Sequence, residues 1–105
     1  MTVVNVNYRL SPEYKPPHGV YDAYAALKYV IHNASILGID SGNVGIMGEE
    51  GGALVAAGVG MLLGSRFESY MVKFQMLLCP QIGDLYMRGE PLANLNEVEK
   101  ANLAW

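Results

Sequence analysis

One stretch of the sequence limits most strongly which fold this chain can adopt. In it, a short apolar run is followed directly by a glycine-flanked acidic pair and then by a long apolar segment. Residues 44–47 and most of residues 53–63 are apolar, and between them stand Gly48, Glu49, Glu50, Gly51 and Gly52. The pattern predicts a buried strand, a very tight turn, and a helix over about 51–63 that is apolar nearly all round and therefore buried. A turn this sharp needs glycine on both sides, because a side chain there would collide with the neighbouring element. Bulk at Gly51 is therefore expected to harm folding.

Composition narrows the classes of function. The chain has 105 residues, a 51% hydrophobic content and a formal net charge of -3, which suits one globular domain. No Lys/Arg stripe is present, so we expect no nucleic-acid partner. The single cysteine, Cys79, excludes an intrachain disulfide and a multi-cysteine zinc site, and its apolar surroundings favour a buried thiol. His18 and His32 lack partners at metal-ligand spacing, so we read both as surface or capping residues and expect no metal and no cofactor.

The longest apolar run, residues 51–64, is too short to span a bilayer, which needs about 20 residues. The start of the chain, residues 1–7, has neither the basic region nor the apolar length of a signal peptide. We therefore expect a soluble chain without a membrane span, and cytoplasmic as the default location.

The remaining elements alternate in type. We expect strands at 2–7, 43–47 and 72–79, helices at 18–38 and 96–105, and a proline-rich loop at 8–17 in which Arg9 pairs with Glu13. This β-α-β-α-β-α order predicts an α/β fold with a mostly parallel sheet. Three strands make a thin sheet with apolar, unpaired edges, which predicts an excerpt of a larger sheet or a truncated gene product. Self-association through the exposed edges is also possible.

Four stretches together resemble one family. They are Val3–Glu13 (V-V-N-V-N-Y-R-L-S-P-E), Asp22–Tyr29 (D-A-Y-A-A-L-K-Y), Gly38–Asp40 (G-I-D) and Gly48–Gly52 (G-E-E-G-G). The chain resembles the hormone-sensitive-lipase-like branch of the α/β-hydrolases, which includes arylacetamide deacetylase-like carboxylesterases. The resemblance implies a three-layer α/β-hydrolase sheet of which residues 1–105 form a central, partial domain. The oxyanion and cap part would precede it, and the catalytic acid and histidine would follow it.

The family hydrolyses carboxylic esters with a serine, a histidine and an acid, and backbone N–H groups bind the oxyanion. By this resemblance Gly48–Gly52 is the nucleophile elbow, Glu50 stands where the serine would be, and the Gly51 N–H is an oxyanion donor. No catalytic residue is then intact. Some α/β-hydrolases use an aspartate at the elbow, but glutamate is one methylene longer, which would misplace the attacking oxygen.

Three functions follow as alternatives. The first is a catalytically inactive, esterase-like pseudoenzyme. The second is an active carboxylesterase or lipase-like hydrolase formed by a longer parent chain, which would act on a small-molecule ester. The third is a non-catalytic binding or scaffold module, with the exposed sheet edges as its interaction surface.

Overall fold

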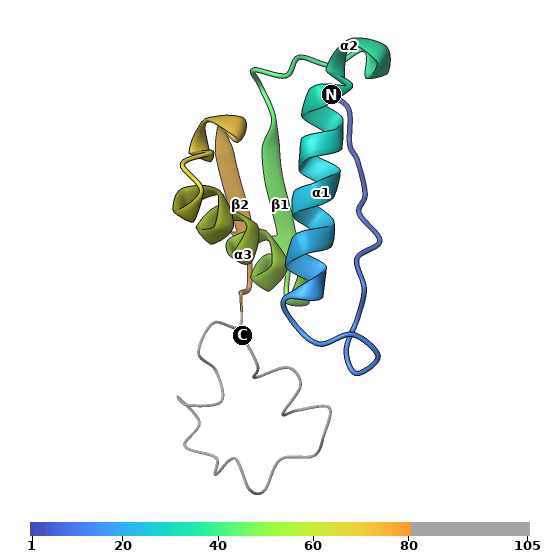
Figure 1. Cartoon of the computed structure of the whole chain (residues 1–105), viewed down its shortest axis with the longest axis vertical. Coiled ribbons are helices and arrows are strands. Elements are labelled where there is room, and N and C mark those ends of the chain that lie inside the picture. The colour runs from blue at the N-terminus through green and yellow to red at the C-terminus, as the bar shows by residue number, and fades with distance from the viewer. Residues whose placement is uncertain (81–105) are drawn as a thin grey trace, which may run out of the picture.

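The computed structural model describes residues 1–80, and the helix expected at 96–105 lies outside that range. The elements follow in the order α1 (His18–His32), α2 (Ala34–Leu37), β1 (Gly45–Glu49), α3 (Gly51–Ser65), the 3-10 helix η1 (Ser69–Met71) and β2 (Phe74–Leu78) (Figure 1). The predicted strand, tight turn and helix around Glu50 are therefore present in the expected order.

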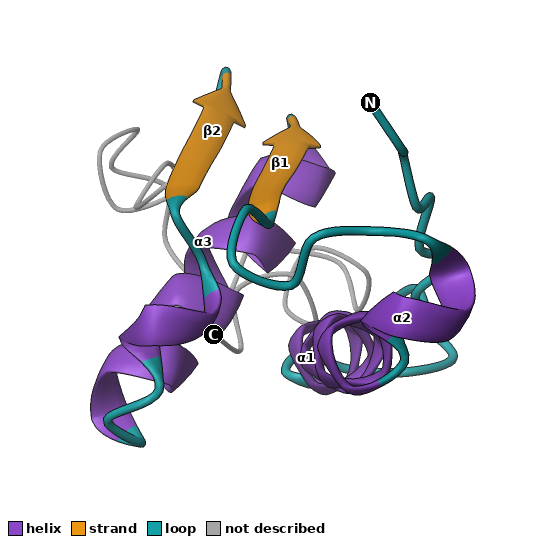
Figure 2. Ribbon diagram, turned by 90° about the horizontal axis from the view of Figure 1, so that it is seen from above, coloured by secondary structure: helices purple, strands orange, loops and turns teal. Residues whose placement is uncertain are grey.

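The two strands form a parallel sheet in which Met47 of β1 lies opposite Met76 of β2. Parallel strands need a crossover, and α3 supplies it by packing on both strands. Helix α1 packs against α3, and both helices lie on one side of the sheet (Figure 2). The structure confirms the predicted α/β class with a parallel sheet.

The core lies between the helices and the inner face of the sheet. Its buried side chains come from α1, α3 and η1: Val20, Tyr24, Leu27, Val59, Leu63 and Met71. The expectation that α3 is buried all round is wrong, because Met61 on this helix is 78% exposed. Only the sides of α3 that meet the sheet and α1 are covered. None of the helices within residues 1–80 has the length and apolarity needed to cross a membrane.

The expected strand at residues 2–7 is absent from the described structure. This segment is coil, and Val3 and Val4 are 76% and 51% exposed. A strand forms only when its N–H and C=O groups pair with a neighbouring strand. The sheet of the described residues contains β1 and β2 alone, so β-rich composition at residues 2–7 does not suffice.

The single helix expected over residues 18–38 is divided at Asn33, where α1 gives way to α2. The side-chain Nδ2 of Asn33 donates a hydrogen bond to the carbonyl oxygen of Tyr29 at 2.8 Å. The Asn33 backbone N–H donates to the same carbonyl at 3.0 Å, so the regular helical hydrogen bond is kept, and the break lies in the backbone of Asn33, whose φ of -109° and ψ of 19° are not helical. Gly38 ends α2 with φ 69°, which confirms it as the closing residue.

Candidate functional site

The turn between β1 and α3 consists of Glu50 alone, since β1 ends at Glu49 and α3 begins at Gly51. Glu50 has φ 50° and ψ -113°, a conformation that L-residues rarely adopt and that costs on the order of 1–3 kcal/mol. Backbone hydrogen bonds hold it there. The Glu50 N–H donates to the carbonyl oxygen of Leu78 at 2.9 Å, and the Ala53 N–H donates to the Glu50 carbonyl at 3.0 Å.

Gly48 makes this turn sterically possible. A Cβ atom on Gly48 would lie 2.0 Å from the carbonyl oxygen of Gly52 and 2.7 Å from the backbone nitrogen of Ala53. Carbon atoms do not approach backbone this closely, so only glycine lets α3 start directly against β1.

Gly51 and Gly52 do not share this constraint. The nearest atom to a Cβ on either is the hydroxyl oxygen of Tyr8, at 3.9 and 3.8 Å, which is ordinary van der Waals contact. The expectation that a side chain at Gly51 would collide with the neighbouring element is therefore wrong. That constraint belongs to Gly48, on the strand side of the turn.

The Glu50 conformation leads to a stability prediction. We expect Glu50→Gly to raise the free energy of unfolding by about 1 kcal/mol, because glycine adopts positive φ without steric cost. Glu49→Gly removes the same charge at the last residue of β1, which is paired with Leu78, and glycine weakens a strand, so the melting temperature of this variant should fall. Thermal unfolding followed by circular dichroism compares the two variants. Equal losses of stability would show that Glu50 is not strained.

The first turn of α3 borders a cavity of about 210 Å³. Its walls come from the loop at residues 8–16 and from the first turns of α1 and α3, including Tyr8, Arg9, Gly19, Gly51 and Val55. The first N–H groups of a helix lack acceptors within the helix, and the helix dipole makes this end favourable for negative charge. The Gly51 N–H is one of these groups, because Gly51 is the first residue of α3. Glu50 is exposed, and its carboxylate forms no capping hydrogen bond with α3.

Arg9 at the edge of this cavity is paired with Asp22 of α1, and the expected pairing with Glu13 is wrong. The Arg9 Nη2 lies 2.8 Å from Asp22 Oδ1, and the Arg9 backbone N–H donates to Asp22 Oδ2 at 2.9 Å. The guanidinium also lies 5.0 Å from the centroid of the Tyr14 ring. Hydrogen bonds from the Arg9 side chain and backbone hold the pKa of Asp22 below its usual value. Asp22 lies one helical turn into α1, where its carboxylate can accept hydrogen bonds from both the backbone and the side chain of Arg9. The Arg9–Asp22 pair thereby anchors the loop that forms one wall of the cavity.

The other residues singled out from the sequence fall in separate places. His18 and His32 are the exposed end residues of α1, and His18 Nδ1 lies 2.6 Å from the carbonyl oxygen of Lys15 in the preceding loop, a contact that caps no helical N–H. Cys79 is exposed with φ 51°, so the expectation of a buried thiol is wrong. It directly follows Leu78, the last residue of β2.

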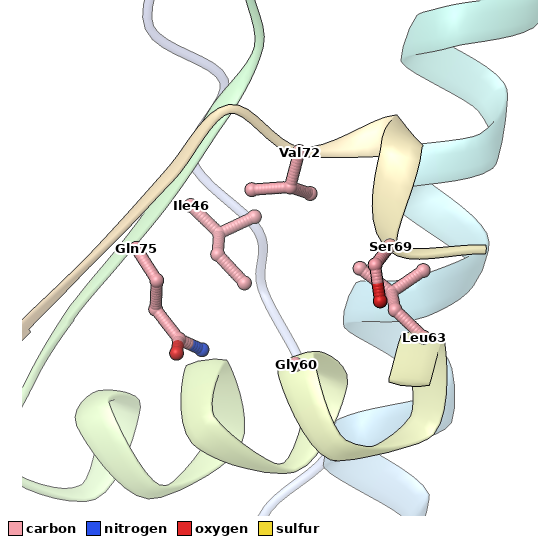
Figure 3. Close-up of a pocket in the computed structure, with 6 residues that line it drawn as sticks. All are labelled: Ile46, Gly60, Leu63, Ser69, Val72 and Gln75. Atoms are coloured by element: carbon pink, nitrogen blue, oxygen red, sulfur yellow. The ribbon is translucent and has the colours of Figure 1, made fainter. Parts of the chain in front are cut away.

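A second cavity, of about 160 Å³, lies away from the turn (Figure 3). It is lined by Ile46, Gly60, Leu63, Ser69, Val72 and Gln75. The Gln75 side chain points from β2 toward α3 and donates a hydrogen bond from Nε2 to the Ala56 carbonyl at 2.6 Å. A Cβ atom on Gly60 would lie 2.8 Å from this amide nitrogen. The glycine therefore allows α3 to pack closely against the Gln75 side chain of β2.

Sequence reasoning missed the roles of Tyr8 and Asp22. Tyr8 packs between two helix starts, because its ring lies 3.1 Å from a Cβ position on Gly19 and its hydroxyl lies over Gly51 and Gly52. Both residues belong to the stretches that carry the family resemblance. Their position in these stretches is the sequence signal that marks Tyr8 and Asp22 as important. No local pattern shows which residues they contact.

Comparisons with known proteins show the family of this chain. A family model described as "alpha/beta hydrolase fold" matches residues 1–104. The chain is similar to an arylesterase of Saccharolobus solfataricus, with 49% identity over 57 residues that are 53% of this chain and 19% of the relative. It is also similar to the arylacetamide deacetylase of Bos taurus, with 37% identity over 83 residues, 76% of this chain and 21% of the relative. The chain thus spans about a fifth of the length of these relatives.

Solved esterase structures superpose on the same region. A hyperthermophilic esterase from the archaeon Pyrobaculum calidifontis matches with a TM-score of 0.66 and 42% identity, over 70% of this chain and 23% of the esterase. A thermostable carboxylesterase cloned from a metagenomic library matches with a TM-score of 0.67 and 36% identity, over 90% of this chain and 34% of the other.

Proposed function

Because the chain belongs to the alpha/beta hydrolase fold family, with esterases among its relatives, we propose that it is an esterase-like pseudoenzyme. In this proposal Glu50 occupies the position of the nucleophilic serine, and the chain alone does not hydrolyse esters. One observation carries the proposal: Glu50 is the single residue between β1 and α3, with φ 50° and ψ -113°. A strained strand-to-helix turn is where this fold presents its nucleophile.

The chemistry at this position argues against ester hydrolysis. An ionised carboxylate at Glu50 would repel the oxyanion that forms when an ester carbonyl is attacked, which opposes the attraction of the Gly51 N–H. A serine nucleophile also needs a histidine to accept its proton. Within residues 1–80 the histidines are His18 and His32 on α1, and no hydrogen bond joins either of them to Glu50.

The test measures hydrolysis of p-nitrophenyl acetate by the purified chain and by Glu50→Ala and Glu50→Ser. We expect all three rates to equal the rate without protein, because the serine variant restores a hydroxyl without a base to activate it. A fluorophosphonate probe, which phosphonylates activated serines with loss of fluoride, should likewise leave Glu50→Ser unlabelled.

Two outcomes would contradict the proposal. Labelling of Glu50→Ser at a rate above that of Glu50→Ala would mean that an activated nucleophile position survives. Turnover by the unmodified chain that is lost in Glu50→Ala would make Glu50 itself catalytic. The alternative of an active carboxylesterase in a longer parent chain requires a serine codon at position 50 of the transcript, with a downstream acid and histidine, and transcript sequencing decides it.

The outer face of the sheet favours a second candidate, a non-catalytic module that self-associates. Four large apolar side chains on this face are exposed: Met47 (66%), Phe74 (56%), Met76 (46%) and Leu78 (42%). Parallel sheets are normally covered by helices on both faces, whereas α1 and α3 cover only one face here (Figure 2). Within the described chain, β1 and β2 each also have one edge without a strand partner.

Sedimentation equilibrium tests this second candidate. We expect the average mass of the chain to rise with concentration, and Met76→Lys to abolish the rise because a buried, unpaired charge is costly. Ile36→Lys is the matched control, since Ile36 is 83% exposed but lies on α2, away from the sheet face. A constant monomer mass over the whole concentration range, or an equal effect of the two variants, would exclude association through this face.

A further inference from the structure

We draw no further inference here: the strongest candidate, the cavity of about 210 Å³ beside the first turn of α3, rests on a helix N-terminus, and among residues 1–80 no buried, unpartnered polar side chain is aimed into it to indicate a ligand.

Discussion

Gly48→Ala is expected to lower the free energy of unfolding by about 3 kcal/mol or more and to displace α3 from β1. The added methyl group would lie 2.0 Å from the Gly52 carbonyl oxygen and 2.3 Å from the Gly52 carbonyl carbon. Both are backbone atoms, so no side-chain rotation relieves the overlap, and the turn must open. Chemical denaturation followed by circular dichroism measures the loss.

Gly51→Ala is the matched control for this prediction. It adds the same methyl group three residues later, where the nearest atom is the Tyr8 hydroxyl at 3.9 Å. Alanine also has a higher helix propensity than glycine, so stability should stay the same or increase by up to about 1 kcal/mol. A Gly48→Ala chain as stable as Gly51→Ala would contradict the geometry of the turn.

Leu63→Ala is expected to cost about 2–5 kcal/mol, the usual range when a fully buried leucine is truncated. Leu63 is 2% exposed and packs in the cluster that joins α1, α3 and η1. Loss of its side chain leaves a cavity at the point where the helices meet, so the unfolding midpoint in urea should fall steeply.

The comparison with Met61→Ala shows whether α3 is covered on one side only. Met61 lies two residues away on the same helix but is 78% exposed, so its truncation should change stability by less than about 0.5 kcal/mol. If Met61→Ala were as costly as Leu63→Ala, another layer would cover that side of α3. These two variants thus distinguish the helix seen in the structure from the fully buried helix that its sequence predicts.

The strand–turn–helix around Glu50 could be predicted because its determinants are local. The apolar run before Gly48, the glycines and the small residues of α3 act through neighbours a few positions apart in the chain. For the same reason Gly38 was identified correctly as a helix end, since positive φ is a property of one residue. The family resemblance, which the family model confirms, rests on the same local motifs.

Contacts between distant segments could not be predicted in this way. Arg9 has an acid four positions away at Glu13, yet it pairs with Asp22, because α1 brings that carboxylate to both the backbone N–H and the guanidinium of Arg9. Residues 2–7 have strand composition but remain coil, because a strand also depends on a neighbouring edge.

By itself, then, the sequence determined the order of β1, the turn and α3, and it placed an acidic residue, Glu50, at that turn. Only the tertiary structure decided that Gly48 is the sterically required glycine and that Asp22 anchors the loop. It also decided that the helices within residues 1–80 cover only one face of the sheet. The physical reason is that backbone conformation and periodicity depend on nearby residues, whereas close approach and burial depend on which distant atoms share the same space.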